Sequence, residues 1–160
     1  MNASFILLGL IILSGVVLGR SAFPAGWIAS VGLAMLALAG IDIILVGVFP
    51  ENENIGLHRV GAAGHFVVGN LAMAVLGVAL SLASEVGSAL AQTGSRPALA
   101  IYSIVSGVVG LAATALFITD HYLGLGIGGM ERVAAYPLPL WLMVAGISFL
   151  RNLPASQSAN

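Results

Sequence analysis

Five long apolar runs constrain this chain more than any other feature of its sequence. They cover residues 3–19, 27–49, 60–84, 98–119 and 130–150. A transmembrane α-helix needs about 17–25 mostly apolar residues to cross the hydrocarbon of a bilayer, and each run has this length. A membrane β-barrel would instead show shorter segments of alternating polarity. The sequence therefore predicts an all-α fold, a polytopic transmembrane helical bundle with five transmembrane helices.

The composition and the prolines agree with this fold. Hydrophobic residues make up 59% of the chain and charged residues 7%, whereas about a quarter of the residues in a soluble domain are charged. We expect a single bundle domain over residues 1–152 and a polar tail at 153–160. Pro50 should end the second helix because proline cannot continue one, and Pro137 and Pro139 should kink the first half of the fifth.

The charges and the absent residue types exclude several classes of function. The five basic residues are all arginines, and the net charge of −1 provides no basic face for nucleic acid. No cysteine is present, so a disulfide, an iron–sulfur cluster and a cysteine nucleophile are excluded. We predict no cofactor. The expected partners are membrane lipid, a small molecule or another membrane protein subunit.

The arginines predict how the chain crosses the membrane. With five helices, Arg20, Arg96 and Arg151 fall on one side, and Arg59 and Arg132 fall on the other together with most of the acids. Cytoplasmic loops collect Lys and Arg, while acids contribute little to orientation. The chain is therefore predicted to be a multi-pass protein of the cell membrane, with its N-terminus outside and its C-terminus in the cytoplasm.

Most of the ionisable residues gather toward the predicted extracytoplasmic side. They form a candidate polar cluster of Asp42, Glu51, His58, Arg59, His65, Asp120, His121, Glu131 and Arg132. Asp42 would lie about 10 Å below the helix end at 1.5 Å per residue. An aspartate in the hydrocarbon costs roughly 2.5–3.5 kcal/mol, so we expect it to face the protein interior and to have a polar partner on the third or fifth helix.

Three interpretations of this cluster remain open from the sequence. The polar residues could be paired and tie the helices together, or they could line an outer vestibule that binds a lipid headgroup, a small molecule or a proton. A third interpretation is a catalytic metal site with His58, His65, His121 and either Asp42 or Asp120 as ligands. Two histidines two turns apart are about 10 Å apart along a helix axis, which disfavours one shared ion.

The adjacent residues Glu131 and Arg132 are predicted to form an ion-pair clamp at the outer rim. An arginine keeps its proton at working pH, so it contributes charge and forked hydrogen bonds rather than acid–base chemistry. Neighbouring residues of a helix point about 100° apart. We therefore expect Arg132 to reach Asp120 or Glu51, and Glu131 to reach Arg59 or a histidine.

Small residues recur on one stripe of the fourth helix, including Ser103, Ser106, Gly107, Gly110 and Thr114. In lipid, such stripes allow helix backbones to approach closely. We expect this stripe to serve packing inside the bundle rather than a contact between two copies of the chain.

Several short motifs occur in a recognisable order along the chain. They are Phe49-Pro50-Glu51, His58, His65-Phe66, Gly129-Met130-Glu131-Arg132 and Trp141. This order resembles the prokaryotic integral membrane protein family known as domain of unknown function 998. The resemblance implies about six helices, one more than here, so either the start lies upstream or this is a shortened member. An extra leading helix would put both termini in the cytoplasm.

The resemblance also marks positions of interest but implies no established reaction. These positions are Pro50, Glu51, His58, His65, Glu131 and Arg132. From residues and resemblance together, we expect a non-catalytic membrane component that binds lipid, a small molecule or a partner subunit on its extracytoplasmic side. The alternatives are an intramembrane metal-dependent hydrolase that uses the outer histidines and aspartates, and a proton-coupled transporter. The inner helix halves carry almost no ionisable residues, which counts against a path across the membrane.

Overall fold

The computed structural model describes residues 2–87 and 96–151, and in this part of the chain every regular element is helical. The elements are α1 (Asn2–Gly19), the short 3-10 helix η1 (Arg20–Ala22), α2 (Trp27–Val48), α3 (Ile55–Gly87), α4 (Arg96–Ile118), α5 (Ile127–Ala135) and α6 (Pro137–Arg151). Within the described residues, five helical segments are long and apolar enough to cross a membrane, with α5 and α6 together forming the fifth. The all-α fold with five candidate transmembrane helices is confirmed.

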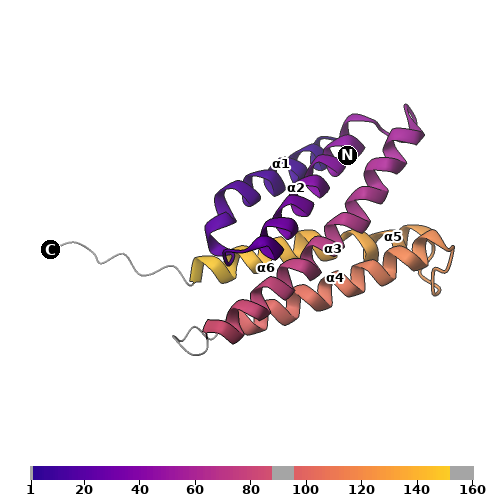
Figure 1. Cartoon of the computed structure of the whole chain (residues 1–160). Coiled ribbons are helices and arrows are strands. Elements are labelled where there is room, and N and C mark those ends of the chain that lie inside the picture. Colours follow the sequence, from indigo (N-terminus) through magenta and orange to yellow (C-terminus); the bar gives the residue numbers. More distant parts are fainter. Residues whose placement is uncertain (1, 88–95, 152–160) are drawn as a thin grey trace.

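The helices form a bundle in which α3 has the central place (Figure 1). α3 packs along α2 on one side and along α4 on the other, while α1 packs mainly against α2 at the edge. α6 packs against α4 and also touches α3. The N-terminus lies at the same end of the bundle as the α2–α3 and α4–α5 connections, and η1 lies at the other end, near the last turn of α6.

The core lies where α2, α3 and α6 meet. Leu36 and Ala39 of α2, Met73 and Leu76 of α3, and Trp141 of α6 are all 3% exposed or less. Many large apolar side chains on the outer faces are exposed instead, which is the expected distribution for helices whose outer faces contact lipid.

The small-residue stripe of α4 packs inside the bundle, as the sequence predicted, and its glycines face α3. A Cβ atom on Gly107 would meet Ala74, and one on Gly110 would overlap the side-chain amide of Asn70. Ser103 is fully buried and contacts Trp141. The stripe therefore serves packing within one chain.

The third helix begins earlier than predicted. α3 begins at Ile55 rather than at residue 60, because the Asn54 side chain accepts a hydrogen bond from the Leu57 N–H at 3.1 Å and caps the first turn. Hydropathy alone does not detect such a cap. The tail predicted at 153–160 lies outside the described residues.

The kink predicted for the fifth helix is confirmed as a break between α5 and α6 at Tyr136. Pro137 and Pro139 have no N–H, so the carbonyls of Val133 and Ala135 lose their usual partners four residues ahead. Two missing hydrogen bonds in one turn weaken the helix at this point. Residues on both sides of the break line a space beside α4.

Candidate functional site

His58 closes the connection between α2 and α3. Its Nδ1 lies 3.1 Å from the carbonyl oxygen of Phe49. Since a carbonyl only accepts, Nδ1 donates, and in the neutral ring Nε2 keeps the lone pair. His58 is half-buried, and its hydrogen bond spans the turn that contains Pro50. This contact is a local clamp on the turn.

His65 links two helices inside the bundle. It is 3% exposed, and its Nδ1 donates to the carbonyl oxygen of Ala39 on α2 at 3.0 Å. Its ring also contacts the ring of Phe66 edge-on. Lipid tails offer no hydrogen-bonding groups that could replace this bond, so it holds the two helices together and gives His65 a structural role.

Asp42 faces α3, as expected, but the polar partner predicted for it is not found. Its carboxylate packs against Gly64, where any Cβ atom would overlap it. No hydrogen bond or ion pair to Asp42 occurs within residues 2–87 and 96–151. Gly61 of α3 likewise lies against the Asp42 backbone, and neither glycine carries a donor side chain. His65 of α3 binds the Ala39 carbonyl rather than Asp42.

Asp120 and His121 belong to the turn after α4. Asp120 has a φ of 59° and accepts a hydrogen bond from the Tyr122 hydroxyl at 2.5 Å. This hydrogen bond raises the pKa of Tyr122 above its usual 10.0. His121 donates from Nδ1 to the Thr119 carbonyl at 2.6 Å. Both residues are exposed and form contacts within the turn itself.

The ion-pair clamp predicted for Glu131 and Arg132 is wrong for the part of the chain that the structure describes. Both side chains are exposed, and neither forms an ion pair with Asp120, Glu51 or Arg59 there. Asp120 is already bound to a tyrosine of its own turn, and Arg132 lines a groove on the surface of the bundle. Helix rotation, which the sequence does not specify, separates these charges.

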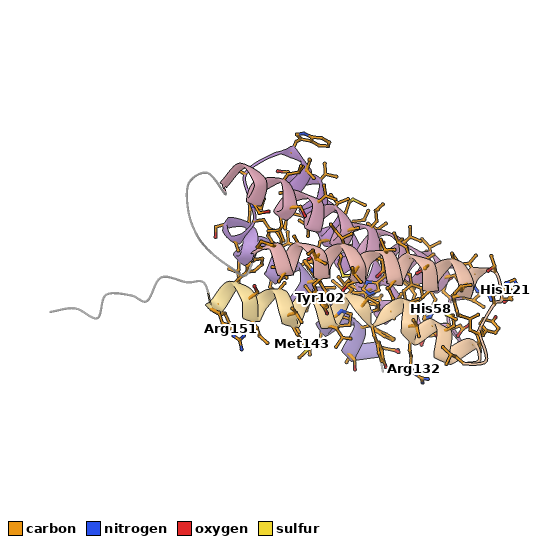
Figure 2. The ribbon with its side chains drawn as sticks, turned by 90° about the horizontal axis from the view of Figure 1, so that it is seen from below. His58, Tyr102, His121, Arg132, Met143 and Arg151 are labelled. Atoms are coloured by element: carbon orange, nitrogen blue, oxygen red, sulfur yellow. The ribbon has the colours of Figure 1, made fainter. Side chains whose placement is uncertain are left out.

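Arg132 lines this groove, a cavity of about 390 Å³ between α4 and the α5–α6 break. The remaining lining residues, from all three helices, are Tyr102, Val105, Ser106, Val109, Val133, Tyr136, Pro137 and Leu140. In Figure 2, Arg132 points away from the bundle, while Tyr102 lies between α4 and α6. The groove thus combines apolar walls with a single cationic lining residue.

Sequence reasoning selected Arg132 but missed the rest of the groove. Tyr102 and Tyr136 lie far apart in the sequence and have no shared motif. The usable signal was the pair Pro137 and Pro139, which predicted a break but not the groove beside it.

Asn70 is a second residue whose role the sequence did not reveal. It is 1% exposed, and its Nδ2 donates to the carbonyls of Phe66 at 2.6 Å and Ala134 at 3.0 Å. The second bond ties α3 to α5 directly before the break. Its Oδ1 is buried against Gly110 and has no hydrogen-bond donor. The hydrogen bonds of His65 to α2 and of Asn70 to α5 therefore run from a side chain to a backbone carbonyl, where salt bridges between helices were predicted.

The candidate metal ligands do not converge. Among the described residues, no group of three or more His, Asp or Glu side chains is placed to hold a metal ion. His58, His65 and His121 each direct Nδ1 at a different backbone carbonyl. The metal-dependent hydrolase alternative therefore gains no support from the geometry.

The comparison with protein families agrees with the motif order. A family model described as "Protein of unknown function (DUF998)" matches residues 1–148. The chain belongs to this family. The DUF998 match covers α1 to α5 and most of α6, so the groove and both histidines of α3 lie inside it. No curated protein matches the chain, and no solved structure matches it. Family and fold together indicate a DUF998 membrane protein of unknown function whose five apolar helices are compatible with a multi-pass topology.

Proposed function

We propose that this protein is a non-catalytic membrane component that binds a phospholipid in the groove between α4 and the α5–α6 break. The observation that carries this proposal is Arg132, an exposed cation that lines an apolar groove and has no acidic partner in the described part of the chain. An arginine on the lipid-facing surface of a membrane protein is stabilised when it meets an anion.

The chemistry of Arg132 suits a lipid phosphate. The planar guanidinium forms two parallel hydrogen bonds to phosphate oxygens. α5 begins at Ile127, and Arg132 is five residues further along the chain. At 1.5 Å per residue, Arg132 lies about 7–8 Å along the helix from its start. This depth, with the reach of a long side chain, suits the boundary between headgroups and acyl chains.

The walls of the groove suit an acyl chain. Val105, Val109 and Leu140 are exposed and apolar, and the other lining residues that carry a hydroxyl group are Tyr102, Ser106 and Tyr136. The volume falls in the range of about 300–1,000 Å³ that is usual for small-molecule sites. A phosphate at Arg132 and a hydrocarbon chain along α4 would use both properties of the groove.

The arginine distribution supports an extracytoplasmic location for this groove. Arg132 and Arg59 belong to the end of the bundle with fewer arginines, whereas Arg20, Arg96 and Arg151 belong to the other. By the positive-inside rule the groove would open to the outer leaflet.

Crosslinking with a photoreactive lipid tests the proposal at the groove itself. A phosphatidylglycerol with a photoreactive acyl chain is added to the full chain in mild detergent, and the crosslinked peptides are located by mass spectrometry. We expect crosslinks on the groove side of α4 and at Leu140. Arg132→Gln should lower their yield roughly fivefold, because one arginine near anionic lipid contributes about that factor. Arg59→Gln, at the same end but outside the groove, is the matched control and should leave the yield unchanged.

Blocking the groove provides the second arm of the experiment. Val108 and Val109 are neighbours on α4 and both exposed, but only Val109 lines the groove. Val109→Trp should abolish the crosslinks at Leu140, and Val108→Trp should not. Equal yields from these two variants, or equal yields from Arg132→Gln and Arg59→Gln, would refute lipid binding at this site.

A further inference from the structure

We propose that a second cavity, at the opposite end of the bundle, binds an acyl chain of an anionic phospholipid whose headgroup lies between Arg20 and Arg151. This inference uses a different cavity and different arginines from the groove at Arg132, and the two sites share no lining residue, so it stands independently of the proposed function.

The cavity lies between the α1–η1–α2 segment and α6. Its volume is about 590 Å³. Residues of all four of these elements line it, together with Leu99 of α4. In Figure 1, η1 and the C-terminal turn of α6 lie close together at one end of the bundle, and the cavity residues of these two elements are found there.

The inner wall of this cavity is aromatic and apolar. Trp141 is 1% exposed, and its indole N–H donates to the Ser103 hydroxyl at 2.7 Å, so the ring directs no free polar group into the cavity. Phe23 of the α1–α2 connection stacks near Trp141 with 6.5 Å between ring centroids, and it meets Phe149 edge-on at 5.0 Å. Such walls favour a hydrocarbon guest over a sugar or a nucleotide.

An apolar cavity of this size would be unfavourable if it were empty. Its lining atoms lose dispersion contacts wherever no partner atom faces them, and water does not fill apolar cavities readily. Within a bilayer the nearest apolar material is the acyl chain of a neighbouring lipid. Entry of one chain would restore these contacts without a change in the helices.

The mouth of the cavity selects the charge of the lipid. Arg20 lies in the sequence between Gly19 and Ser21, and both of these neighbours line the cavity. Arg151 directly follows Leu150, which also lines it, and Figure 2 shows Arg151 at the end of α6. Both arginines are exposed, and neither forms an ion pair with another described residue. Two unpaired guanidinium groups beside one apolar cavity fit a lipid with a net negative headgroup.

The two tryptophans of the chain make the cavity directly observable. Trp27 is 76% exposed and Trp141 lies in the cavity wall. In a Trp27→Phe background, the tryptophan fluorescence comes from Trp141 alone. Bulk lipid barely reaches a side chain that is 1% exposed, so a lipid with brominated acyl chains should quench this fluorescence much more strongly when a chain enters the cavity than from the bulk phase.

The experiment compares brominated phosphatidylglycerol with brominated phosphatidylcholine, titrated into the full chain in mild detergent. We expect saturable quenching by phosphatidylglycerol at a lipid fraction roughly tenfold lower than by phosphatidylcholine, since each arginine near the headgroup favours the anion by several fold. The variant with both Arg20→Gln and Arg151→Gln should lose this preference. Arg132→Gln should keep it, because Arg132 belongs to the other groove, and so the two proposals can fail separately.

A cavity-filling variant checks that the quenching lipid occupies this cavity. Gly146 lines it, and a Cβ atom there would meet nothing within 4 Å, so Gly146→Leu has space for its side chain. Quenching should fall in this variant while the helical circular dichroism stays unchanged. The proposal is overturned if neither lipid quenches Trp141, if both quench equally in the parent protein, or if the preference survives removal of both arginines.

Discussion

Replacement of Gly110 by alanine tests whether Asn70 fixes the distance between α3 and α4. A Cβ atom at Gly110 would overlap the Asn70 side chain, with Nδ2 2.7 Å away and the Cγ and Oδ1 atoms closer still. Asn70 cannot withdraw freely, because its Nδ2 is bound to Phe66 and Ala134 at 2.6 and 3.0 Å. The variant must therefore separate the helices or break these hydrogen bonds.

The expected loss can be estimated from these contacts. Hydrogen bonds between membrane helices average about 0.6 kcal/mol each, so losing both costs about 1 kcal/mol. Forcing an extra carbon into a packed core adds roughly 1–3 kcal/mol. Alanine offsets up to about 1 kcal/mol through its higher helix propensity. The free energy of unfolding of Gly110→Ala should therefore be lower by roughly 2 kcal/mol than that of the parent.

Unfolding of the parent and variants in one detergent, followed by circular dichroism, measures this difference. Gly146→Ala is the matched control, since its Cβ atom meets nothing within 4 Å, and helix propensity alone should leave it unchanged or slightly more stable. The double variant Gly110→Ala with Asn70→Ala removes the overlap and should recover part of the loss. The reasoning fails if Gly110→Ala is as stable as Gly146→Ala, or if the losses of the two single variants simply add.

Three further predictions concern other parts of the molecule. His65→Leu removes the hydrogen bond from α3 to α2 and should lower the free energy of unfolding by about 0.6–1.7 kcal/mol, measurable in the same unfolding assay. Tyr122 should ionise above its usual pKa of 10.0 because its hydroxyl donates to Asp120. The small stabilisation from this bond is present below pH 10 and is lost as the pH rises through the raised pKa. The pKa of Tyr122 can be measured from the phenolate absorbance of the protein after subtraction of the absorbance of the Tyr122→Phe variant. Asp120→Asn should shift this pKa back toward 10.0. The chain contains no cysteine, so a single introduced cysteine reports on which side of the membrane its loop lies. Asn52→Cys should react with an impermeant thiol reagent in intact cells, and Thr93→Cys should not. The opposite pattern would show that the orientation is inverted.

The sequence by itself determined the elements that depend on local chemistry. A backbone in hydrocarbon must satisfy its own hydrogen bonds, so long apolar runs become helices whatever packs beside them. The break before α6 follows from Pro137 and Pro139 for a similarly local reason. The buried face of α4 could be read from the spacing of its small residues. Even the start of α3 has a local cause, the cap at Asn54, which hydropathy does not detect.

The tertiary structure alone decided which polar groups meet. Asp42 was expected to have a polar partner on the third or fifth helix, yet it faces Gly64, and His65 bonds to the Ala39 carbonyl. Arg132 was expected to meet an acid, yet it lines a groove whose other residues come from α4 and from both sides of the α5–α6 break. The partner of a side chain depends on the rotation, depth and crossing angle of two helices, and these come from packing over their whole length. A change of one residue in register moves a side chain by about 100° around its helix, enough to replace an ion pair with a surface groove.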